Sequence, residues 1–136
     1  MNILIAEDDY ASKRFLIKLL TPYGKCDETS DGIETVEAFV TAHEIRKPYD
    51  LLCLDIMMPK IDGLKALKTI REYEMKKGVS ESEQCKVIIT SALSESEVSY
   101  MSTNPEHEVY VVKPFNVETF KDAMRKLGLL QDNAKK

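Results

Sequence analysis

Short apolar runs alternate with longer segments of helical period along this chain, and this alternation constrains the fold more than any other feature. Four clear runs and one weaker run are present, at residues 2–6, 50–55, 85–90 and 108–112, with the weaker one at 25–29. Continuous apolar runs of this length are typical of strands that are buried on both faces, as in a parallel sheet.

The segments between these runs are predicted to be helices. Apolar side chains recur at spacings of three or four residues in 11–20, 32–46, 63–76 and 116–127. The remaining segment, 94–103, has few apolar residues and gives the weakest helix pattern. We expect it to be a mobile or partner-facing element.

The order of these segments predicts the fold class. A strand followed by a helix, repeated five times, indicates a three-layer (βα)5 α/β fold with a parallel sheet and right-handed crossovers. Five strands favour the flavodoxin-like order 2-1-3-4-5, which places a site at the carboxyl ends of strands 1 and 3. A length of 136 residues suits one domain. We predict a domain at 1–128 and a short C-terminal tail at 129–136.

The composition argues against several classes of protein. Lys and Arg number 19 and Asp and Glu 23, so the net charge of −4 argues against nucleic-acid binding through bulk charge. No apolar stretch approaches the length of a membrane span, and the N-terminus lacks the pattern of a signal peptide. Cys26, Cys53 and Cys85 are odd in number and far apart, which argues against a disulfide framework or a zinc site. Together these features predict a cytoplasmic protein.

Acidic, hydroxyl and basic side chains lie at or directly after the ends of four of the predicted strands. They are Glu7, Asp8, Asp9, Asp55, Ser91 and Lys113. Because the carboxyl ends of parallel strands meet at one edge of a sheet, we expect these side chains to converge.

Clustered carboxylates at this edge indicate a metal site. Like charges so close together raise one another's pKa unless a cation intervenes, and small clusters of oxygen ligands suit Mg²⁺. We therefore predict that Glu7 and Asp8 bind a metal and that Asp9 is the N-cap of the first helix. A carboxylate held beside Mg²⁺ can also act as a nucleophile and form an aspartyl phosphate, which is the role that we predict for Asp55. Lys113 would supply the opposing positive charge.

The chain resembles the receiver domain of two-component response regulators, the CheY-like family. The resemblance covers residue 1 to about 128 and rests on four blocks in the expected order: ILIAEDD, LDIMMPKIDG, IITSA and VVKPF. It implies a receiver that accepts a phosphoryl group from a sensor histidine kinase or a histidine phosphotransfer protein. The reaction would depend on Mg²⁺, with Mn²⁺ as a substitute, and would be self-catalysed transfer and autodephosphorylation rather than enzymatic turnover.

The resemblance also implies roles for residues around the metal. Asp55 resembles the phosphoacceptor and is a metal ligand as well. Asp8 resembles a direct ligand of Mg²⁺, and Glu7 an acid that acts largely through water. The backbone carbonyl of Met57 resembles a further ligand.

Other roles concern phosphoryl binding and signalling. Ser91 resembles the hydroxyl that follows the phosphoryl group inward, and Lys113 the lysine that pairs with the acceptor and the phosphate. The bond between Lys113 and Pro114 is expected to be cis. Tyr110 resembles the switch aromatic, and from its pattern alone it would be a half-buried strand tyrosine.

The family resemblance further implies that the switch reshapes one face of the domain. This face comprises 94–103, 108–112 and 116–127 and includes Tyr100 and Phe115. A downstream protein would bind there, with the receiver as a monomer or a phosphorylation-dependent dimer. If the chain is complete, its output is expected to be a protein contact, because no room is left for a second domain.

Some residues depart from the family pattern or stand outside it. The segments 76–84 and 41–49 are longer than usual, and the first is predicted to be a polar loop. Met57 and Leu93 are apolar at the positions two residues after Asp55 and Ser91, so neither side chain can orient an attacking water. We expect slow hydrolysis of the phosphoryl group. His43 and His107 are isolated, and we expect both to be surface residues.

Three other functions were weighed. A phosphatase of the haloacid dehalogenase type needs a second Asp at the position of Met57, and a flavodoxin needs a phosphate cradle in place of the three acids. Both are therefore disfavoured. The remaining alternative is a receiver-like docking module that is not phosphorylated, against which the set Asp8, Asp55, Ser91 and Lys113 argues.

Overall fold

A five-stranded parallel sheet forms the centre of the computed structural model, which describes residues 1–92 and 106–131. The elements are β1 (Asn2–Ala6), α1 (Tyr10–Leu20), η1 (Thr21–Tyr23), β2 (Lys25–Thr29), α2 (Gly32–Glu44), β3 (Leu51–Asp55), α3 (Gly63–Lys76), η2 (Glu81–Glu83), β4 (Lys86–Ser91), β5 (Glu108–Val112) and α5 (Val117–Lys126). The helix predicted at 94–103 lies outside the described residues. All five predicted strands are confirmed.

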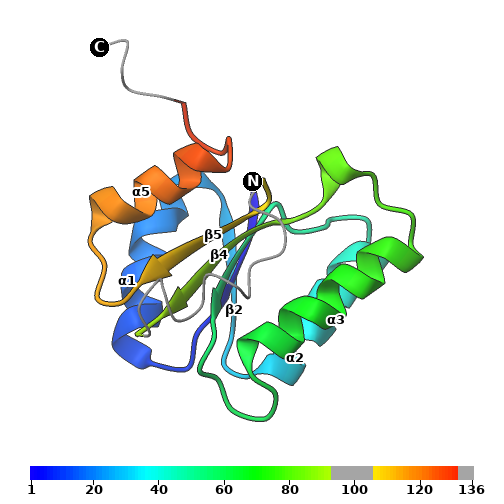
Figure 1. Cartoon of the computed structure of the whole chain (residues 1–136), viewed down its shortest axis with the longest axis horizontal. Helices are drawn as coiled ribbons and strands as arrows, with labels where there is room; N and C mark the ends of the chain where they lie inside the picture. Colours follow the sequence, from blue (N-terminus) through cyan, green and yellow to red (C-terminus); the bar gives the residue numbers. More distant parts are fainter. Residues whose placement is uncertain (93–105, 132–136) are drawn as a thin grey trace.

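The sheet has the predicted strand order, β2-β1-β3-β4-β5, and each neighbouring pair is parallel. Helices α1 and α5 lie on one side of the sheet, and α2 and α3 lie on the other (Figure 1). The three-layer α/β fold is therefore confirmed. Order 2-1-3-4-5 puts the reversal of winding between β1 and β3, where a ligand site is expected at the carboxyl ends of the strands.

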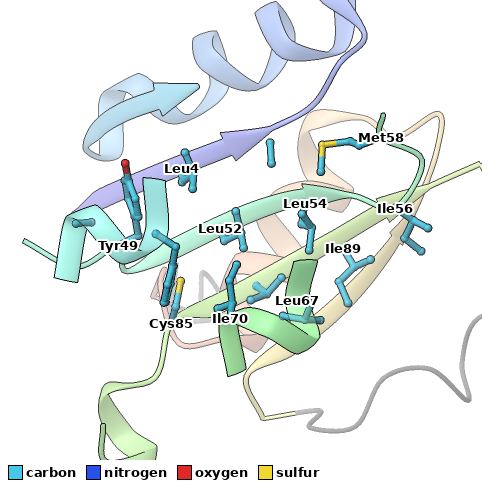
Figure 2. Packing of buried hydrophobic residues seen from close by; sticks show 14 residues of the cluster. Leu4, Tyr49, Leu52, Leu54, Ile56, Met58, Leu67, Ile70, Cys85 and Ile89 are labelled. Carbon is cyan, nitrogen blue, oxygen red and sulfur yellow. The ribbon is translucent and has the colours of Figure 1, made fainter. Parts of the chain in front are cut away.

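The middle residues of the central strands are apolar because both faces of each strand pack against helices. In β3, Leu52 and Leu54 face the cluster formed with α2 and α3 (Figure 2). The alternate residues Leu51 and Cys53 face the cluster formed with α1 and α5. This burial on both faces is why five consecutive residues of β3 are inaccessible to water.

Short polar side chains cap the described α-helices and determine where each one begins. The four N-caps are Asp9, Asp31, Asp62 and Asn116, and each accepts a hydrogen bond from the N–H group three residues further on. The predicted cap at Asp9 is confirmed. A cap of this kind stabilises a helix by about 1 kcal/mol. Because α1 and α3 begin at caps close behind β1 and β3, the loops at the site are held at both ends.

One surface assignment was wrong. His107 was expected at the surface, but it is 3% exposed and lies in the turn directly before β5. Its Nδ1 atom is 2.7 Å from Nζ of Lys86. His43 is partly buried, and its ring contacts the rings of Phe39 and Tyr73 in tilted and edge-on arrangements. An isolated histidine in a polar stretch gives no sign of such neighbours, because they come from other elements.

Further details of the chain differ from the expectation or extend it. The predicted loop at 76–84 contains the last residue of α3 and the short 3-10 helix η2. Leu129 and Leu130, in the predicted tail, are partly buried against the cluster of α1 and α5.

The three cysteines all lie in the described part of the chain and are free thiols. Among the described residues, no helix is long and apolar enough to cross a membrane.

Candidate functional site

Three carboxylates meet at the carboxyl ends of β1 and β3. These strands are neighbours, with Ala6 paired to Leu54, so the residues that follow each strand end are brought side by side. Candidate ligand oxygens of Glu7, Asp8 and Asp55 all lie within 4.8 Å of one another. Glu7 and Asp55 are 1% and 4% exposed, whereas Asp8 is open to solvent. The cluster therefore has two fixed acids and one side through which an ion can enter.

Lys113 brings a positive charge to this cluster from the end of β5. Its Nζ atom donates to Oε1 of Glu7 at 2.8 Å and lies 3.4 Å from Oδ2 of Asp55. Its backbone N–H donates to the carbonyl of Ser91 at 2.6 Å, which continues the β4–β5 ladder past the last strand residue. The peptide bond from Lys113 to Pro114 is cis, as predicted.

The environment of the cluster raises the pKa values of both Glu7 and Lys113. Burial is the largest influence on Glu7 and raises the pKa of its carboxyl group, and the charge of Asp55 acts in the same direction. Hydrogen bonds from Lys113 and from the N–H of Asp9 oppose this rise without cancelling it. Burial alone would lower the pKa of Lys113, but the bond to Glu7 and the charge of Asp55 outweigh burial and raise it. Lys113 is thus a firmly protonated counter-charge.

Asp55 is held in place by the loop that follows it. Its Oδ1 atom accepts a hydrogen bond of 3.1 Å from the backbone N–H of Met57, and its Oδ2 atom faces Lys113. The N–H of Ile56 donates to the carbonyl of Thr90, so the chain stays attached to β4 before it turns. Met57 itself is 66% exposed. One carboxylate oxygen is therefore fixed by the backbone, and the other is available for chemistry.

Two supports of this loop were missed by the sequence reasoning. Gly63 begins α3 directly behind Asp55, and a Cβ atom there would overlap the carbonyl oxygen of Asp55. Lys60 has a φ angle of 73°, in the left-handed region, and its Nζ atom lies 3.3 Å from Oδ2 of Asp31 at the start of α2. The glycine after Asp62 was a visible signal for the first support. Nothing in the sequence indicates the contact between Lys60 and Asp31.

The predicted switch residues lie on neighbouring strands. Ser91 is the last residue of β4, is fully buried and pairs with Val112 of β5. Tyr110 is half-buried, as its pattern predicted, and packs against the cluster of α2 and α3. Phe115 packs instead in the cluster of α1 and α5, so it and Tyr110 lie on opposite sides of the sheet. Tyr100 and Leu93 lie outside the described residues.

Known proteins share this fold and sequence pattern. A profile of the family described as "Response regulator receiver domain" matches residues 3–125. A chain of the crystal structure of the CheX–CheY–BeF3–Mg²⁺ complex from Borrelia burgdorferi has a TM-score of 0.74 and 25% identity. That similarity covers 96% of this chain and 90% of the other.

Two curated relatives are similar in sequence. Hybrid signal transduction histidine kinase K of Dictyostelium discoideum is 31% identical over 131 residues, which are 91% of this chain and 10% of that protein. Response regulator ArlR of Staphylococcus epidermidis is 31% identical over 118 residues, which are 86% of this chain and 48% of that protein. This chain spans less than half the length of either relative. The profile match over nearly the whole chain, together with the fold, shows that the chain belongs to the response regulator receiver domain family of two-component signalling.

Proposed function

We propose that this chain accepts a phosphoryl group on Asp55 from a phosphohistidine of a sensor histidine kinase or a histidine phosphotransfer protein. The observation that carries the proposal is the environment of Asp55 at the end of β3. Its carboxylate is buried, is oriented by the N–H of Met57, faces the ammonium group of Lys113 and lies beside two further acids. This combination prepares one carboxylate to attack an electrophile that carries several negative charges.

The reaction is proposed to need Mg²⁺, with Mn²⁺ as a substitute. The donor set fits, because Glu7, Asp8 and Asp55 offer only oxygen atoms within 4.8 Å of one another and Asp8 is open to solvent. The backbone carbonyl of Met57 would complete the protein ligands. When bound, the ion would neutralise the acids and the negative charge of the phosphoryl group. The similar crystal structure from Borrelia burgdorferi contains Mg²⁺ and BeF3.

The transfer itself is a substitution at phosphorus. A carboxylate oxygen of Asp55 forms a bond to phosphorus while the bond from phosphorus to the imidazole nitrogen breaks, and the electron pair of that bond stays on the nitrogen. Lys113 is positioned to gather negative charge on the phosphoryl oxygens, and Ser91 to donate a hydrogen bond to one of them. Asp55 is consumed in the reaction, so we propose a stoichiometric acceptor that dephosphorylates itself and not a turnover enzyme.

The surface beside the site is suited to a protein donor. A hollow of about 450 Å³ opens next to Lys113 and is lined by Ala11, Ser12, Phe15, Ala92, Lys113, Pro114 and Phe115. Most of these side chains are apolar or small. The exposed ring of Tyr10 lies at the start of α1, the helix that supplies Ala11, Ser12 and Phe15. We propose that the donor protein docks in this hollow, because a helix laid there would bring its histidine towards Asp55.

Signalling is proposed to proceed through Ser91 and Tyr110. The two residues lie on neighbouring strands, and Tyr110 is partly buried against the cluster of α2 and α3. Movement of the Ser91 hydroxyl towards the phosphoryl group would leave space into which Tyr110 turns. The surface around β5 and α5 would then bind a downstream protein.

Phosphate-affinity electrophoresis tests the proposed acceptor. The protein is incubated with acetyl phosphate and Mg²⁺, and retarded protein is compared between the wild type, Asp55→Ala and Asp122→Asn. Asp122 is an exposed carboxylate on α5, away from the site, and serves as the matched control. We expect retardation of the wild type and of Asp122→Asn, its loss on omission of Mg²⁺, and its absence in Asp55→Ala. Retardation of Asp55→Ala would exclude Asp55 as the acceptor.

The phosphorylated form is expected to be long-lived, because Met57, the exposed residue two positions after Asp55, has no polar side-chain atom that could orient water. Substitution of Met57 by Asn together with Leu93 by Glu should shorten the half-life by about tenfold, since a positioned water reacts faster than a random one. Decay of the retarded band after removal of acetyl phosphate measures this half-life. Met75→Asn, at another exposed methionine on α3, is the control. Equal half-lives in the wild type and the double variant would contradict the prediction.

A further inference from the structure

We propose that Glu81, Glu106 and His107 form a binding site for a divalent ion of the zinc class. Glu81 belongs to η2, which precedes β4, and the other two residues form the turn directly before β5. Because β4 and β5 are parallel neighbours, their amino ends meet at one edge of the sheet. Candidate ligand atoms of the three residues all lie within 4.8 Å of one another. This edge is opposite the one that carries Asp55.

The ring of His107 gives an independent indication of a ligand. His107 is 3% exposed, and its Nε2 atom has no hydrogen-bond partner among the described residues. The nearest carboxylate oxygen of Glu81 is 4.0 Å away, too far for a hydrogen bond. A buried polar atom without a partner is costly, and such atoms are rare in native proteins. A metal ion between His107 and Glu81 would satisfy this nitrogen.

The donor set selects the class of ion. One imidazole nitrogen and two carboxylates suit Zn²⁺, Co²⁺ or Ni²⁺ better than Mg²⁺, which prefers oxygen ligands alone. The cluster at Asp55 contains only oxygen donors, so the two edges of the sheet are suited to different ions.

The cluster can contract to the size of a metal site. Donor atoms around tetrahedral zinc lie about 3.3 Å apart, because each bond is roughly 2.0–2.2 Å long. His107 is fixed by its surroundings, but the Glu81 side chain is 72% exposed and can turn towards the ring. Glu106 is also exposed, and water can fill the fourth position. Of the three ligands, only the two glutamates need to move.

Lys86 is expected to oppose the binding of an ion to His107. Its Nζ atom lies 2.7 Å from Nδ1 of His107, so the charged lysine donates to Nδ1, and in the neutral ring the proton resides on Nε2. An ion at Nε2 requires this proton to move to Nδ1 and Lys86 to turn away. No proton is lost overall, but the contact with Lys86 is exchanged for the metal bond. We therefore expect Lys86 to weaken binding, and its removal to strengthen it.

Calorimetric titration of Zn²⁺ into the full chain, in excess Mg²⁺ to occupy the other edge, tests the proposal. We expect one ion per chain, an affinity lowered by about tenfold or more in His107→Gln and Glu81→Gln, and raised by about tenfold in Lys86→Met. His43→Gln is the matched control and should bind as the wild type does. Undiminished binding by folded His107→Gln, or no binding by either the wild type or Lys86→Met, would overturn the proposal.

Nuclear magnetic resonance gives a second test that does not depend on the folding of a His107 variant. The chain has two histidines, so His43→Gln leaves only the ring nitrogens of His107 to be observed. Zn²⁺ is expected to change the ring from the form protonated at Nε2 to the form protonated at Nδ1, with a large shift of the Nε2 signal. Unchanged signals at saturating Zn²⁺ would overturn the site even if the ion binds elsewhere.

Discussion

Replacement of Lys113 by methionine is expected to slow phosphorylation by acetyl phosphate by about 100- to 1,000-fold. The Nζ atom lies 2.8 Å from Glu7 and 3.4 Å from Asp55, so it is the cation best placed to stabilise negative charge during transfer. Methionine keeps the length and much of the volume of the side chain but removes the charge. The rate at which retarded protein accumulates in Mg²⁺ measures the effect.

A loss of stability could imitate a loss of chemistry, because Lys113→Met also leaves the buried Glu7 without its counter-charge. The double variant Lys113→Met with Glu7→Gln has no uncompensated charge at position 7. We expect it to regain much of the lost thermal stability, which would identify the unpaired Glu7 as the cause of that loss. Lys126→Met, an exposed lysine on α5, should behave as the wild type does. Wild-type rates in Lys113→Met would show that Lys113 does not contribute to transfer.

The fold was predictable because the signal for each strand is contained in the strand itself. The residues of β3 are all buried, so no polar residue interrupts the run, and its limits in the structure differ from the prediction by one residue. Strand order followed from the alternation of strands and helices. Even β2, with mostly exposed side chains, was predicted, although from a weaker run than the other strands.

The candidate site was predictable for a related reason. Asp55 is the last residue of its strand, and Glu7 and Lys113 each follow a strand directly. Parallel strands bring such residues to one edge whatever the details of packing. Contacts between elements gave no such signal. The buried His107 contacts Lys86 of β4, and the left-handed backbone of Lys60 goes with a contact to the start of α2. A pattern within one segment does not record which side chain faces it from another.

A buried network of ion pairs that starts on α3 shows this limit most clearly. Arg71 donates from Nη1 to Glu74 at 2.7 Å and from Nε to Glu108 of β5 at 3.0 Å. The second oxygen of Glu74 accepts the backbone N–H of Cys85 at 2.8 Å, directly before β4. Both carboxylates are almost fully buried, so Arg71 joins α3 to β5, and its partner Glu74 joins α3 to the residue before β4. The apolar pattern of 63–76 predicted the helix and its buried face but not these charges.

Substitution of Arg71 by methionine is expected to lower the free energy of unfolding by about 3–5 kcal/mol, because it leaves two buried carboxylates without their counter-charge. Denaturant unfolding measures the change, and Lys68→Met, on the exposed face of the same helix, should change stability by less than about 0.5 kcal/mol. Addition of Glu108→Gln to Arg71→Met should recover part of the loss, because it removes one of the two uncompensated charges. A deficit below about 1 kcal/mol at neutral pH would mean that relaxation or water entry replaces the arginine, and that α3 is joined to β5 by apolar packing alone.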